Sequence, residues 1–136
     1  INSASTCVVI VNNNGRLGIS PNIRQLSSKI AGGLAGRVTI LQAGVYSISA
    51  ATLPNFIVAP IGGDTGVTRQ VLVDGTATNL VTGFSLNIPE RNGSPGFTVN
   101  SFGMSSRVNL NINFIANRPV SFPSGPYRAL VVVRCE

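Results

Sequence analysis

The sequence predicts an all-β protein, with one domain over residues 1–136 built as a single antiparallel β-sandwich, immunoglobulin-like or similar, of about seven to nine short strands. Apolar and polar residues alternate in several short segments, which is the pattern of a strand with one buried face. Pairs rich in Gly, Asn and Asp separate these segments and supply the bends between strands. The segments follow one another too closely to leave room for βαβ units.

The clearest strand is expected at residues 107–114, where four apolar residues share one face and three asparagines share the other. Residues 83–88 alternate in the same way, with Phe84, Leu86 and Ile88 expected to point inward, and the pattern stops at a proline. Other strands are expected at residues 6–11, 37–42, 45–52, 55–59, 67–73, 97–102 and 126–135.

Two local signals make sharper predictions. Asp74-Gly75, between β-forming residues, predicts a two-residue hairpin turn. Apolar residues at helical spacing predict a helical turn within residues 22–31, ended by Gly32-Gly33.

The composition favours a secreted protein at the cell surface or in the extracellular medium. Charged residues make up 10% of the chain, against roughly 25% in an average globular protein. The net charge is +6, but the arginines are scattered singly without interleaved aromatics, so no specific nucleic-acid binding is expected. The longest apolar runs are far shorter than the roughly 20 residues of a membrane helix, so no membrane span is expected.

The sequence offers no catalytic or metal-binding set, so we expect no enzyme, no metal site and no cofactor. The chain contains no histidine, which removes Ser-His and Cys-His nucleophiles and the usual zinc sites. Its four carboxylates stand in different segments, at Asp64, Asp74, Glu90 and Glu136.

The two cysteines, Cys7 and Cys135, stand near opposite ends of the chain. We interpret them as a disulfide that staples the terminal strands together. Closing so long a loop stabilises a fold by about 4 to 5 kcal/mol in the chain-entropy description. Two buried free thiols and an intermolecular link are the alternatives.

The terminal strands are apolar on both faces, so each is expected to be covered on both sides. The candidate assembly strand consists of Val8, Val9, Ile10 and Val11. An uncovered strand of this kind pairs readily with another chain. Two placements of residues 1–11 are open: in the groove of a neighbouring copy, or as part of the chain's own sheet.

The chain resembles the secreted pilin-like domains of the chaperone-usher and spore-coat-U type. The likeness rests on the cysteine-bearing apolar strand Cys7 to Val11, the Asn-Gly turns that follow it, and the final Gly-x-Tyr strand from Gly125 to Val133. It implies an immunoglobulin-like sandwich that polymerises by donor-strand exchange and has no catalytic residues. Cysteine pairs of that family usually close shorter loops than Cys7 to Cys135, and a bond between these two cysteines would tether the N-terminal strand to its own domain.

Two functions from different classes follow. The first is an extracellular structural subunit whose partners are other copies of itself, forming a homopolymer such as a filament, pilus or coat. The second is a secreted β-sandwich binding module, in which loops 60–68 and 89–96 hold a glycan or a protein ligand on a rigid scaffold.

Overall fold

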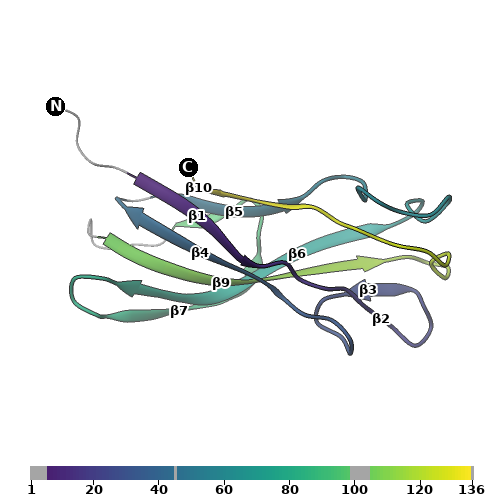
Figure 1. Cartoon of the computed structure of the whole chain (residues 1–136), viewed down its shortest axis with the longest axis horizontal. Helices are drawn as coiled ribbons and strands as arrows, with labels where there is room; N and C mark the ends of the chain where they lie inside the picture. Colours follow the sequence, from purple (N-terminus) through teal and green to yellow (C-terminus); the bar gives the residue numbers. More distant parts are fainter. Residues whose placement is uncertain (1–5, 45, 99–104, 136) are drawn as a thin grey trace.

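The computed structural model describes residues 6–44, 46–98 and 105–135, which form two antiparallel β-sheets packed face to face (Figure 1). No helix is present in these ranges, so the all-β prediction is confirmed. The described residues form ten strands, slightly more than the seven to nine expected: β1 (Thr6–Asn13), β2 (Gly18–Ile19), β3 (Gln25–Ser27), β4 (Gly36–Ala43), β5 (Ser47–Thr52), β6 (Thr68–Asn79), β7 (Ser85–Asn92), β8 (Phe97–Thr98), β9 (Ser105–Asn117) and β10 (Val131–Cys135).

The large sheet of seven strands is organised around β9. One side of β9 pairs with β4 along its first part and with β3 near its end, while the other side pairs with β6 over its whole length. β1 lies outside β4, β2 lies outside β3, and β7 lies outside β6. β1 and β7 are therefore edge strands on opposite sides of the large sheet.

The small sheet has three strands in the order β10, β5, β8 and covers part of one face of the large sheet (Figure 1). β5 supplies its centre, pairing with β10 through Val131↔Thr52 to Cys135↔Ile48. The backbone N–H of Ala50 in β5 donates to the carbonyl of Gly93, just after β7, at 2.9 Å. This bond ties the two layers together on the side away from β10.

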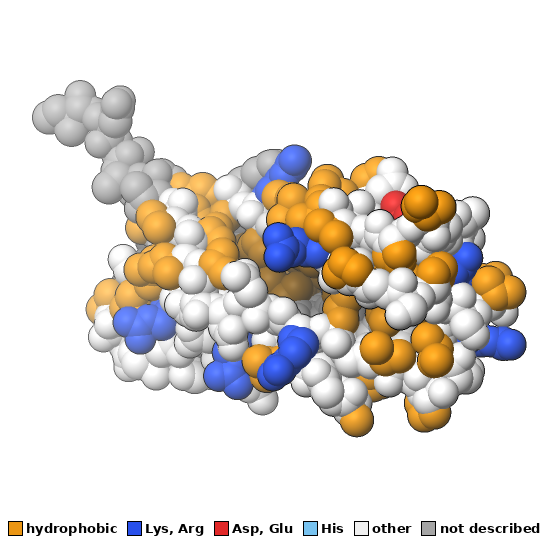
Figure 2. All heavy atoms as spheres, turned by 45° about the vertical axis from the view of Figure 1, so that its right-hand side comes forward, with side chains coloured by type: hydrophobic (Ala, Val, Ile, Leu, Met, Phe, Trp, Pro, Cys, Tyr) orange, Lys and Arg blue, Asp and Glu red, His pale blue; other side chains and the backbone are white. Residues whose placement is uncertain are grey.

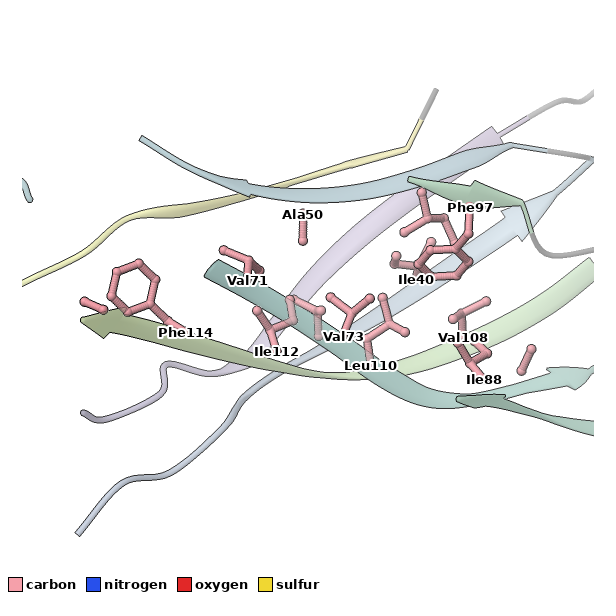
Figure 3. Packing of buried hydrophobic residues seen from close by; sticks show 14 of the residues in the cluster. Ile40, Ala50, Val71, Val73, Ile88, Phe97, Val108, Leu110, Ile112 and Phe114 are labelled. Carbon is pink, nitrogen blue, oxygen red and sulfur yellow. The ribbon is translucent and has the colours of Figure 1, made fainter. Parts of the chain in front are cut away.

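The core lies between the sheets and confirms the alternation predicted for β9 (Figure 3). The inward side chains of β9 are all buried, and those of β4, β5 and β6 meet them from the neighbouring strands and the opposite sheet. Ile40, Ile48, Val73, Val108 and Leu110 are the largest apolar side chains that are almost fully buried. Their burial is the main source of fold stability.

The prediction of a hairpin turn at Asp74-Gly75 is wrong, because both residues lie inside the continuous strand β6. The chain instead reverses at residues 80–84, between β6 and β7. The pairing of β6 with β7 shifts register between Val73 and Gly75, so the Asp-Gly pair marks a β-bulge. A Cβ atom added at Gly75 would stand 1.9 Å from the backbone oxygen of Asn109, so the glycine is required by close strand approach.

Other local expectations also change in the folded chain. Residues 22–31 form no helical turn: Gln25–Ser27 is strand β3, and Leu26 is drawn into the core by pairing with β9. Residues 55–59 form only an isolated bridge through Val58. Position 45 and positions 99–102 of two expected strands lie outside the described residues.

The inward pattern predicted for residues 83–88 holds for Ile88 alone, which is buried. Phe84 and Leu86 are 57% and 50% exposed. They lie toward the tip of the β6–β7 hairpin, which extends beyond the small sheet (Figure 1). Period-two patterning therefore identified the face, but the small sheet is too short to cover it.

An aromatic cluster closes one end of the sandwich. Phe56 contacts Phe114 and Tyr127 edge to face, and Tyr127 contacts Phe122 in the same way. The Tyr127 hydroxyl donates to the backbone carbonyl of Pro123 at 2.6 Å. Burial raises the pKa of this phenol, and the positive charge of Arg118 acts in the opposite direction.

Gly75, in the bulge of β6, allows a test of the close contact between β6 and β9. We expect Gly75→Ala to lower the free energy of unfolding by about 3 kcal/mol or more, the upper part of the range for overpacked sites, because its Cβ would overlap the β9 backbone. Gly36→Ala is the matched control, since its Cβ would meet only ordinary contacts of 3.5 to 3.7 Å. Urea denaturation followed by circular dichroism measures both, and equal stability of the two variants would contradict the assigned strand contact.

Candidate functional site

The predicted assembly strand lies in β1, at the edge of the large sheet. It pairs antiparallel with β4 from Thr6↔Ala43 to Val11↔Val38. Within the described residues no strand pairs with its other side. The chain therefore uses these residues to complete its own sheet, and the outward backbone groups of β1 form an open edge.

The apolar residues of β1 divide between two faces. Cys7 and Val9 pack against the core, whereas Val8 and Ile10 lie on the outer face and are 51% and 42% exposed. Val11 pairs with the buried Val38 and so lies on the inner face, yet it is 63% exposed. The expectation that β1 is covered on both faces is wrong for the single chain, because the small sheet covers only the inner face of the large one. The result is an exposed apolar strip on an unpaired strand.

The cysteines form a disulfide within the chain, which confirms the predicted pairing. Cys7 in β1 is bonded to Cys135 in β10, with their Cα atoms 6.3 Å apart. No free cysteine remains, so the free-thiol and intermolecular alternatives do not apply to this structure. The bond joins the edge strand of the large sheet to the edge strand of the small sheet.

Both sheets are consequently open on the same side of the sandwich. β10 pairs only with β5 among the described strands, and Val131, Val132 and Val133 are half-buried. Figure 2 shows apolar side chains spread over this side of the molecule, with several basic and hardly any acidic side chains among them. We call the outward sides of β1 and β10 the terminal edge.

The opposite edge of the large sheet differs in chemistry. β7 contains Pro89, Glu90 and Arg91. The Lys29 ammonium donates to the Glu90 carboxylate at 2.6 Å. Proline and charged residues are the usual means of preventing edge-to-edge pairing, and β1 has neither.

A second feature is a shallow groove of about 380 Å³ on the outer face of the large sheet. The Asn12 amide donates to the Thr39 hydroxyl at 2.6 Å, and this hydroxyl donates to the Asn109 side-chain oxygen at 3.0 Å. The walls of the groove are mostly neutral hydrogen-bonding groups together with one guanidinium. They come from Asn12, Arg37, Thr76, Asn109 and Asn111. Sequence reasoning missed this groove; its only signal was the run of alternating asparagines in residues 107–114.

The loops predicted to bind a ligand use their charged side chains internally. In loop 60–68, Asp64 pairs with Arg69 and accepts the backbone N–H of Phe56 at 3.2 Å. Burial lowers the pKa of the Arg69 guanidinium. In loop 89–96, Arg91 stacks over the Phe97 ring at 5.0 Å. The ion pair leaves little of the Asp64 charge for a partner, whereas Arg91 remains exposed.

Within residues 6–44, 46–98 and 105–135, no group of three or more His, Cys, Asp or Glu side chains could hold a metal ion. The same ranges contain no helix long and apolar enough to cross a membrane.

Removing the disulfide tests the stability that it supplies. We expect the double variant Cys7→Ser and Cys135→Ser to lose about 4 to 5 kcal/mol of unfolding free energy, because its denatured chain regains the entropy of an open loop. Urea denaturation measures the loss, and wild-type protein in reductant should reproduce it. A loss below about 1 kcal/mol would contradict the role assigned to this bond.

Comparison with known proteins finds no match for the chain among protein-family models, curated proteins or solved structures.

Proposed function

We propose that the protein is an extracellular structural subunit that self-assembles through its terminal strands into a filament, pilus or coat. The observation that carries the proposal is the open terminal edge, where an unpaired strand without charge or proline exposes Val8, Ile10 and Val11. Such an edge templates pairing with another strand. The disulfide supports the extracellular assignment, since such bonds persist mainly in oxidising compartments.

The same geometry supports one way of sharing strands between copies. β1 is hydrogen-bonded to β4 in its own sheet and is tied to β10 by the disulfide. Donating β1 to a neighbour would break the first interaction and strain the second. Addition of a strand to the open edge breaks neither, so we favour edge addition over donor-strand exchange as the assembly step.

Two added charges on the exposed face of β1 should prevent assembly without unfolding the monomer. We expect the double variant Val8→Lys and Ile10→Lys to remain monomeric, because like charges at a sheet edge oppose pairing. The control is Phe84→Lys with Leu86→Lys, which adds the same charge at equally exposed apolar residues of the opposite hairpin. Light scattering over a concentration series and electron microscopy report assembly, and circular dichroism checks folding. A wild-type protein that stays monomeric throughout, or equal assembly of both variants, would contradict the proposal.

The outer-face groove favours a second candidate function, binding of a neutral glycan. Amide and hydroxyl groups from Asn12, Thr76, Asn109 and Asn111 converge there beside one guanidinium, and sugar hydroxyls both donate to and accept from such groups. We look for a ligand in the groove rather than at loops 60–68 and 89–96, because the groove gathers several polar side chains, whereas Asp64 and Glu90 of the loops are already paired with Arg69 and Lys29.

A glycan array tests this second candidate. For any glycan that binds, we expect Asn111→Ala to weaken affinity by about tenfold, the effect of losing one hydrogen bond of about 1.4 kcal/mol. Asn87→Ala is the matched control, since Asn87 is an exposed asparagine of β7 outside the groove. Absence of any array signal, or equal loss in both variants, would rule out a glycan site in the groove.

A further inference from the structure

We infer that β1 pairs with β1 of a second copy, antiparallel, about a two-fold axis at Val9. The inference rests on the proposed self-assembly and names the contact that it uses. An antiparallel pair of identical strands is self-complementary, so each copy offers the same surface to the other. The pairing would continue the large sheet of one copy into the large sheet of the next.

The register follows from the residues of β1. With Val9 opposite Val9 of the second copy, Val8 lies opposite the second copy's Ile10 and Cys7 lies opposite its Val11, so residues 7–11 meet only apolar residues. A shift in one direction sets Ile10 opposite Thr6, and a shift in the other sets Val8 opposite Asn12. Odd shifts are excluded, because they would place outward side chains opposite inward ones in a continuous sheet.

The charge distribution selects a second copy's β1 over the other edges of this chain. β1 has no ionisable residue from Thr6 to Asn13, so its best match is another neutral, apolar strand. β7 would set Glu90 and Arg91 against valines and interrupts its ladder at Pro89. β10 contains Arg134, so pairing β10 with β10 of a second copy would bring a positive charge from each copy into the contact. Only β1 matches itself without an opposed charge.

The disulfide prepares this contact. It anchors Cys7 to the small sheet, so the β1 edge is already held in an extended conformation before a partner arrives. A preorganised edge loses less conformational entropy on pairing than a free segment would. Because two-fold pairing closes on itself, the unit that builds a filament or coat is a dimer, and further growth uses a different surface.

Cysteine crosslinking between two exposed positions tests the register. We expect a mixture of the Val8→Cys and Ile10→Cys proteins to form a disulfide-linked dimer about fivefold faster than either protein alone, because directly opposed Cβ atoms are about 5 Å apart and diagonal ones about 7 Å. Both side chains are largely exposed, so neither variant should disturb the fold. Non-reducing electrophoresis measures the dimer, and peptide mapping checks that the Cys7–Cys135 bond is intact.

The control mixture pairs Val8→Cys with Leu86→Cys, which would crosslink only if β1 met β7 in a head-to-tail chain. Sedimentation of the wild-type protein separates the two levels of the proposal. A wild type that never self-associates would overturn the proposed function together with this contact. A wild type that associates, with no preference for the Val8–Ile10 mixture or with a preference for the control mixture, would overturn the two-fold β1 contact alone.

Discussion

The pairing of β9 with β4, β3 and β6 is the constraint on which the large sheet depends. β9 is the longest strand, and each of its sides is occupied along the chain by strands from distant parts of the sequence. Its strict alternation directs Val108, Leu110 and Ile112 into the core and the asparagines to the outer face. A slip of one residue would exchange these faces, so the same strand sets both the core and the polar surface.

The two sheets differ in size, and this difference explains which apolar side chains remain exposed to solvent. Three strands cannot cover seven, so the small sheet covers the middle of the inner face and leaves the β6–β7 hairpin tip exposed. Among the described residues no second sheet packs on the outer face of the large sheet, which is consistent with its Asn and Thr residues. Val8 and Ile10 of β1 are exposed apolar side chains on that face, and this contrast is the reason to treat them as a contact surface.

Part of the candidate site could be predicted from the sequence. The run Val8 to Val11 stands out by composition, and the placement of Cys7 and Cys135 predicted the bond that joins the terminal strands. The open edge could not be predicted, because it depends on β4 taking one side of β1 and on no strand taking the other. The outer-face groove could not be predicted either, since Asn12, Arg37, Thr76 and Asn109 come from four strands joined only by long-range register.

The sequence by itself determined the class of fold, the buried face of β9 and the stapling of the two ends, because period-two patterning and cysteine placement act locally or through a single bond. Only the tertiary structure decided that Asp74-Gly75 is a bulge, that residues 25–27 form a strand, and that Phe84 and Leu86 stay exposed. The physical reason is common to all three. Each outcome depends on the strand or sheet that lies alongside, and that neighbour comes from far away in the chain.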